Sequence, residues 1–189
     1  GAGLDLGEVQ QVVDHAQQAA AGGADAVDIR LLRAAERALL QQRVSVPVEL
    51  AMRYQNPSVP DVVRKLARQG VTELFLLPLF PHYAMSSYET AVVWVRENIA
   101  RHAPQMKLTV QQPYYDSPDY IAALGAVASE AVKSDFDHLL ISFHGVPERQ
   151  IKKSDPTKCH CLTVPNCCEV VSSAHEFCYR AQCFKTAKL

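Results

Sequence analysis

The segment Asp137-His-Leu-Leu-Ile-Ser-Phe-His-Gly-Val-Pro-Glu-Arg149 organises the chain. Its apolar run at 139–143 is short and is followed by Gly145 and Pro147, which is typical of a buried strand. In open α/β sheets, ligands bind at the carboxyl ends of the strands. The pattern therefore places His144, whose side chain suits proton transfer near neutral pH, at the mouth of a cleft. Taken alone, however, such a histidine more often caps a strand or bonds a loop.

Strands and helices alternate in the sequence that precedes this segment. The Glu73–Phe80 run is nearly all apolar, as in a strand buried on both faces, and Pro78 indicates that pairing stops near it. We expect further strands at 46–54 and 107–112, and helices at 8–21, 27–42, 58–69, 120–132 and in the stretch that ends near 102. Residues 172–189 also have a helical pattern. The alternation predicts an α/β fold, with a parallel sheet covered by helices on both faces.

Composition and charge narrow the class of protein. The 189 residues suit one domain, or one domain and part of another, and 48% hydrophobic content allows a sizeable core. The formal charge of -1, with basic residues dispersed, argues against nucleic-acid binding. We find neither a bilayer-spanning stretch nor a secretion signal, and so expect a cytoplasmic protein.

Cysteine usage is uneven. All six cysteines fall between Cys159 and Cys183. A disulfide scaffold would spread them through a small secreted chain, whereas this crowding favours metal or cluster binding.

Three loops that each follow a predicted strand carry polar and aromatic side chains, and parallel strands would bring them to one edge of the sheet. Together they predict a pocket for a flat, apolar ligand that bears carboxylates. The alternative, equally supported by spacing alone, is that the arginine pairs within its own domain and the tyrosines are packing residues. The loop residues are Arg53 and Tyr54, then His82, Tyr83, Ser86 and Ser87, then Ser142 and His144.

We expect the charged side chains of Glu148, Arg149 and Asp155 to be solvated.

Several motifs in order resemble one family. Ala51-Met-Arg-Tyr-Gln-Asn-Pro57, Pro78-Leu-Phe-Pro-His-Tyr83 and Ser142-Phe-His-Gly-Val-Pro-Glu-Arg149, with Ser154-Asp-Pro156, are similar to segments of ferrochelatases. The spacing between the motifs also matches, and the resemblance covers roughly residues 44–189.

The resemblance implies an enzyme of two Rossmann-like domains that inserts ferrous iron into protoporphyrin IX, the last step of haem biosynthesis. It makes His144 the residue that accepts a pyrrole proton or receives the iron. It places Arg53 and Tyr54, and the loop with Tyr83, Ser86 and Ser87, in the porphyrin pocket. On this basis, residues 1–133 are the first chelatase domain, and 134–189 begin the second with a cysteine-rich insert.

The cysteine segment is similar to the insert of a bacterial subgroup that binds a [2Fe–2S] cluster. Four thiolates are required, and five cysteines qualify: Cys159, Cys161, Cys167, Cys168 and Cys178. Cys183 aligns better with a cysteine of cluster-free members. The alternative is a structural zinc ion, for which His160 or His175 could complete the ligand set.

Two family features are missing from this sequence, namely the glycine-rich first strand and the acidic residue opposite the histidine. We therefore expect a fragment or a truncated product. The rival hypotheses are an iron–sulfur or zinc module without catalytic activity, and a chelatase that acts on sirohydrochlorin. Peripheral membrane contact and homodimer formation stay open.

Overall fold

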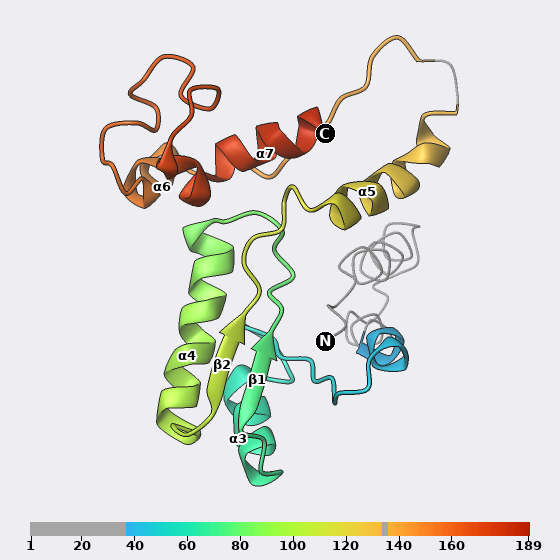
Figure 1. Cartoon of the computed structure of the whole chain (residues 1–189), viewed down its shortest axis with the longest axis vertical. Coiled ribbons are helices and arrows are strands. Elements are labelled where there is room, and N and C mark those ends of the chain that lie inside the picture. The colour runs from blue at the N-terminus through green and yellow to red at the C-terminus, as the bar shows by residue number, and fades with distance from the viewer. Residues whose placement is uncertain (1–36, 134–135) are drawn as a thin grey trace. The chain divides into compact units, whose positions relative to one another are not determined.

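The computed structural model describes residues 37–133 and 136–189, which divide into two compact units (Figure 1). Unit 1 holds the described residues up to Pro57 together with Ser117–His138, and unit 2 holds Ser58–Asp116 and Leu139–Leu189. The predicted helix at 8–21 lies outside the described residues, as does most of the one at 27–42.

Unit 1 contains a helical segment at 37–43 and helix α5, Pro118–Ala131, both at predicted positions. The predicted strand at 46–54 is wrong, because no regular strand forms there. Instead, the Gln41 side chain forms hydrogen bonds with backbone groups of this stretch. Its Oε1 accepts the Val48 N–H at 2.8 Å, and its Nε2 donates to the Val46 carbonyl at 3.0 Å. The polar backbone groups thus find a side-chain partner in place of a neighbouring strand.

Unit 2 contains the sheet. Strands β1, Glu73–Leu76, and β2, Lys107–Val110, pair in parallel from Glu73 opposite Lys107 to Leu76 opposite Val110. Helix α3, Val59–Arg68, begins where the Ser58 hydroxyl accepts the Asp61 N–H, and helix α4, Thr90–His102, joins the two strands. Elements β1, α4 and β2 confirm the predicted βαβ unit, and β1 ends before Pro78, as expected of a residue that cannot donate to the ladder.

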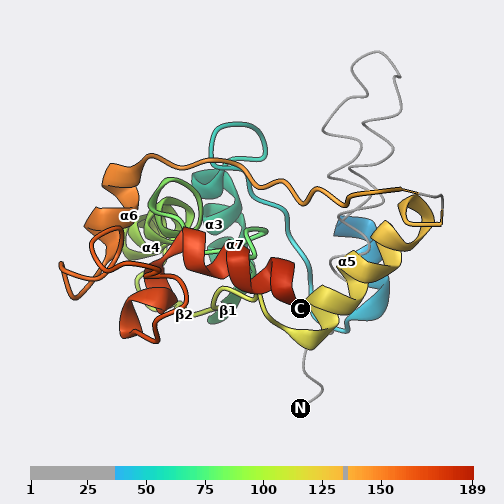
Figure 2. The same cartoon turned by 90° about the horizontal axis from the view of Figure 1, so that it is seen from above.

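Helices α3 and α4 pack against each other and against one face of this sheet (Figure 2). Leu74, Leu76 and Leu108 point to that face and contact a core formed by both helices. The alternate residue Phe75 is 47% exposed. The expected α/β architecture with a parallel sheet is therefore present, and within the described part of unit 2 the helices cover one of its two faces.

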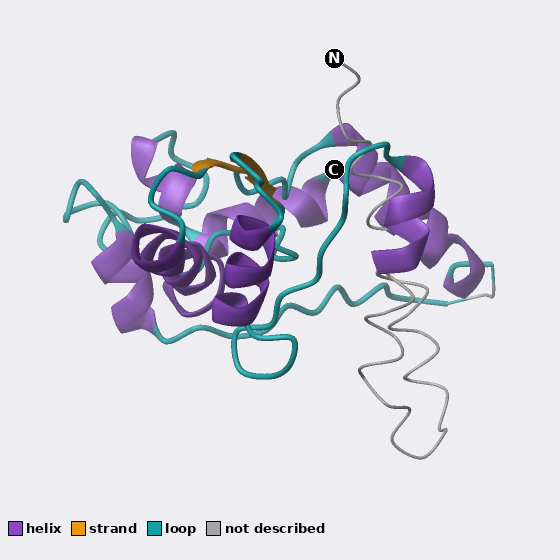
Figure 3. Ribbon diagram, turned by 90° about the horizontal axis from the view of Figure 1, so that it is seen from below, coloured by secondary structure: helices purple, strands orange, loops and turns teal. Residues whose placement is uncertain are grey.

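The predicted strand at 139–143 is wrong. This stretch is loop (Figure 3), and Leu139, Leu140 and Ile141 are 61%, 89% and 50% exposed. A strand needs a neighbour to pair with, and no described strand pairs with this run. Beyond it lie α6, Glu148–Ser154, the 3₁₀ helix η2, Ser173–Phe177, and α7, Tyr179–Lys188. The helical expectation for 172–189 is thus confirmed in outline.

Candidate active site and cysteine cluster

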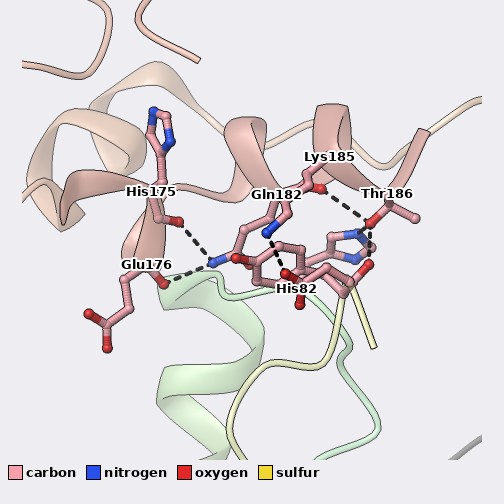
Figure 4. Close-up of polar contacts among 8 residues, drawn as sticks. His82, His175, Glu176, Gln182, Lys185 and Thr186 are labelled. Carbon is pink, nitrogen blue, oxygen red and sulfur yellow. Dashed lines mark hydrogen bonds and ion pairs between the residues drawn. The ribbon is translucent and has the colours of Figure 1, made fainter. Parts of the chain in front are cut away.

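The loop that follows β1 packs against helix α7 (Figure 4). The His82 Nε2 lies 2.9 Å from the Thr186 hydroxyl, which in turn lies 2.7 Å from the Tyr115 carbonyl oxygen. Because a carbonyl only accepts, the hydroxyl donates to it, and His82 therefore donates from Nε2. Burial lowers the pKa of His82 to about 4, so the ring is neutral at physiological pH.

His144 lies in the exposed loop before α6, between two anchored neighbours. On one side, the Phe143 ring meets the His82 ring edge-on, with centroids 5.5 Å apart. On the other side, Val146 packs against the buried cluster that contains Cys161 and Cys178. The loop is therefore anchored on both sides of His144, and His144 itself is exposed.

The second group of predicted site residues lies at the turn before α4. Ser86 and Ser87 belong to a π-helical turn, η1, Met85–Glu89, where Ser86 is exposed and Ser87 half-buried. π-Helical turns occur frequently at functional sites. Tyr83, by contrast, is buried, and its ring lies 5.3 Å from that of Phe177. Burial raises the pKa of Tyr83 far above its ordinary value, so its hydroxyl stays protonated.

Arg53 and Tyr54 lie in unit 1. The Arg53 Nε donates to the Tyr54 hydroxyl at 3.2 Å, and its guanidinium lies 5.1 Å from the centroid of the same ring. Tyr54 is 84% exposed. The pair thus presents a cation and an aromatic face to solvent, a combination able to bind an aromatic anion.

Four of the five candidate cysteines lie together. Cys161, Cys168 and Cys178 pack in one buried cluster, and Cys167 lies near Cys161 and Cys168. Cys178 also lies close enough to Cys168 for its charge to affect that thiol. The fifth candidate, Cys159, is exposed and its sulfur lies 3.8 Å from the Thr157 hydroxyl. The structure therefore separates Cys159 from the other four.

Burial, with the neighbouring thiols, raises the pKa of Cys161 and of Cys168 well above the ordinary value. Without metal the thiols are thus protonated at neutral pH, and a bound cation would have to displace their protons. Among the described residues, no group of three or more His, Cys, Asp or Glu side chains is arranged to hold a metal ion.

Both histidines of the segment contact one backbone oxygen. His160 and His175 each place Nε2 2.7 Å from the Cys167 carbonyl, with ring centroids 5.5 Å apart. Both rings must donate from Nε2, since a carbonyl accepts only. The Nε2 atoms of His160 and His175 are therefore already used as hydrogen-bond donors, which argues against a zinc site that has them as ligands. The Leu162 N–H also donates to the Cys167 sulfur at 3.3 Å.

The expectation that Asp155 is solvated is wrong, because this residue is 2% exposed. One carboxylate oxygen accepts the Thr157 N–H and hydroxyl, and the other accepts the N–H groups of His160 and Cys161, all within 2.9 Å. Burial opposes ionisation, but these hydrogen bonds outweigh it and hold the pKa of Asp155 well below its usual range. The carboxylate thereby fixes the turn that bears Cys161.

Replacing Asp155 by asparagine should lower the free energy of unfolding of the metal-free chain by about 3 kcal/mol, because an amide NH₂ would face two donors. The depressed pKa means that the wild-type carboxylate stabilises the fold above pH ~4 and loses this effect as the pH falls further. Urea unfolding at pH 7 and at lower pH measures both effects. The exposed Asp137→Asn is the control, and equal losses in the two variants would contradict the assignment.

Gln182 and Thr186 are functional candidates that motif spacing did not indicate. Both are buried polar residues of α7 that bind the loop after β1. Their spacing of four residues places them on one helical face, but nothing local in the sequence shows that this face meets a loop about 100 residues earlier. For Asp155, the sequence contains one indication of a structural role, which is its position between the end of a helix and Pro156.

The sequence is similar to proteins of one known family. The family model described as Ferrochelatase matches residues 25–189. A ferrochelatase of Opitutus terrae is 48% identical over 142 residues, which cover 75% of this chain and 41% of that protein. One of Stutzerimonas stutzeri is 48% identical over 143 residues (75% and 42%), and one of Pseudomonas entomophila 43% over 159 residues (84% and 47%). The chain thus spans about half the length of the curated relatives it matches. No solved structure matches it significantly.

Within the described ranges, no helix is both long and apolar enough to cross a membrane.

Proposed function

The chain belongs to the ferrochelatase family, and on that premise we propose that it supplies part of the catalytic site of an enzyme that inserts ferrous iron into protoporphyrin IX to form protohaem. The reaction is the closing step of haem biosynthesis. Residues 1–133 are proposed to form the first domain of this enzyme, and residues 134–189 the beginning of the second.

The placement of His144 carries this proposal. Insertion requires two pyrrole N–H protons to leave as Fe²⁺ enters, so a base must reach the face of the macrocycle. An exposed imidazole on a loop anchored at Phe143 and Val146 meets that need. Imidazole is also a good ligand for iron, so the same side chain can receive the metal.

Arg53 and Tyr54 are proposed to bind the porphyrin, with Ser86, Ser87 and Tyr83 on the other loop. The Arg53 guanidinium would pair with a propionate, while the exposed Tyr54 ring offers an aromatic surface. Since Tyr83 is buried, we propose that it contributes by shaping its loop.

Arg53→Ala should weaken protoporphyrin IX binding about tenfold, the effect expected from loss of one charge-assisted hydrogen bond. Quenching of porphyrin fluorescence on titration with the chain measures the change. Arg68→Ala, at an exposed arginine of α3, is the matched control and should leave binding unchanged. Equal affinities of Arg53→Ala and the wild-type chain would remove Arg53 from the pocket.

We also propose that the cysteines hold a [2Fe–2S] cluster, with Cys161, Cys167, Cys168 and Cys178 as ligands. The donor chemistry fits: Cys161, Cys168 and Cys178 pack in one buried cluster with Cys167 nearby, and a backbone N–H already points at the Cys167 sulfur. Cys168 lines a cavity of about 300 Å³, which gives small ions access to this thiol. When bound, the cluster would cross-link the segment between α6 and α7.

Ferrous iron and protoporphyrin IX are the proposed substrates, and the cytoplasm is the proposed location. Dispersed basic residues and a net charge of -1 argue against nucleic-acid partners. The exposed run at Leu139–Ile141 favours contact with a further protein surface.

Anaerobic incubation of the chain with ferrous iron and protoporphyrin IX tests the function. Formation of protohaem above the rate of the protein-free mixture is the expected result, followed by its visible absorption. Sirohydrochlorin as a competitor separates the related chelatase hypothesis. If the chain takes up iron and sulfide but neither binds porphyrin nor forms haem, it is a metal-binding module and the enzymatic proposal is wrong.

A further inference from the structure

Gln182 of α7 joins three segments through one buried amide (Figure 4). The side chain is 1% exposed. Its Oε1 accepts the backbone N–H of Tyr83 at 2.6 Å, and its Nε2 donates to the carbonyls of His175 and Glu176 at 3.2 and 2.8 Å. The acceptor end therefore faces the loop after β1, and the donor end faces η2 in the cysteine segment.

Both donor hydrogens of this amide and its oxygen are engaged with backbone groups. Both Nε2 hydrogens have backbone acceptors, and Oε1 has a backbone donor. A buried polar group that loses its partner is costly. Displacement of η2 would strand the NH₂ group, and rotation of the amide to follow it would turn a donor toward the Tyr83 N–H. The two ends are thus mechanically linked.

The donor end lies inside the cysteine segment. η2 ends at Phe177, directly before Cys178, and Cys178 packs with Cys161 and Cys168 in one buried cluster. The acceptor end lies beside the loop residues that the proposed function assigns to the porphyrin pocket. A second contact from the same helix face, Thr186 to His82, holds the next part of that interface.

We propose that Gln182 is a positioning residue that couples the metal-loaded state of the cysteine segment to the conformation of the loop at 81–89. The inference rests on the proposed function of that segment and loop. Loading fixes Cys178 and the adjacent η2, η2 orients the Gln182 amide, and the amide fixes the Tyr83 backbone. Loss of metal releases Cys178 and η2, so the Gln182 amide is no longer held and the loop at 81–89 opens more often.

Hydrogen exchange of the 81–89 segment, followed by mass spectrometry with and without anaerobic loading by ferrous iron and sulfide, tests this coupling. In the wild-type chain, loading should slow exchange about tenfold, the effect of securing roughly one hydrogen bond against local opening. Visible absorption and iron content report loading independently, and neither depends on catalytic activity.

Gln182→Glu separates the two ends of the amide. It keeps an acceptor for the Tyr83 N–H but places a carboxylate oxygen against the carbonyls of His175 and Glu176. We expect it to load with iron as the wild type does, while its 81–89 segment no longer responds. Gln182→Met removes both ends, so exchange of the segment should be fast in either state. Gln105→Glu, at an exposed position, is the control and should behave as wild type.

The outcomes separate this inference from the proposed function. If Gln182→Glu loads and its loop still responds as in the wild type, the coupling is wrong and the proposed function stands. If wild-type loading produces visible bands without slowing exchange, the coupling is also wrong. If the wild-type chain takes up no iron and sulfide, the cluster proposal fails, and the inference fails with it. If both Gln182 variants lose iron uptake, Gln182 holds the cysteines themselves, which overturns the inference.

Discussion

His144→Ala should abolish detectable iron insertion, with a loss of about 10²- to 10⁴-fold, the contribution of a positioned general base. The loss should appear in the rate at saturating porphyrin and leave porphyrin affinity nearly unchanged, since His144 is assigned to proton transfer and metal receipt. Initial rates of protohaem formation under anaerobic conditions, at several porphyrin concentrations, measure both quantities.

The fold should tolerate this substitution. His144 is exposed, and the contacts that hold its loop are made by Phe143 and Val146. His138→Ala provides a matched control, because His138 is also exposed and lies six residues earlier. Insertion retained by His144→Ala, or lost equally by both variants, would contradict the role given to His144.

The βαβ unit could be predicted because its signals are local. Each signal acts within a few residues of the element that it defines. Ser58 caps helix α3, an apolar stripe marks its buried face, and Pro78 prevents further strand pairing after β1. The parallel pairing of β1 and β2 then follows from the helix between them.

The predicted strands at 46–54 and 139–143 failed for a non-local reason. An apolar or β-branched run becomes a strand only where another strand accepts its hydrogen bonds, and sequence alone does not show whether one does. At 46–54 the Gln41 side chain takes the backbone groups, and at 139–143 the run stays exposed. The expected placement of His144 at the carboxyl end of a strand is therefore wrong, and His144 stays a candidate through the family resemblance alone.

The cysteine segment shows a different limit. Crowding of cysteines predicted a thiol site, but spacing did not choose four from five, because the segment has little regular structure to fix which thiols converge. The choice depends on contacts such as the Asp155 carboxylate on the Cys161 N–H. Asp155 was judged solvated from its charge, whereas four donors make its burial tolerable.

Cys178→Ser should prevent cluster assembly. Cys178 is 2% exposed and packs with Cys161 and Cys168, so its thiol adjoins two of the other proposed ligands. Serine is close in size but is a poor ligand for iron at neutral pH, since its hydroxyl stays protonated. After anaerobic reconstitution we expect the wild-type chain to hold iron and inorganic sulfide in equal amounts with visible absorption bands, and Cys178→Ser to hold almost neither.

The same pair of proteins should differ in stability only when metal is supplied. A ligand present at 100 times its dissociation constant stabilises the folded state by about 2.7 kcal/mol, and Cys178→Ser should lose that gain. Cys159→Ser is the control that decides between the five candidates, because Cys159 is exposed, contacts Thr157 and lies outside the buried cluster that holds Cys161, Cys168 and Cys178. It should load and gain stability like the wild type. If Cys159→Ser fails to load while Cys168→Ser loads, Cys159 is the fourth ligand and the set inferred from the buried thiols is wrong.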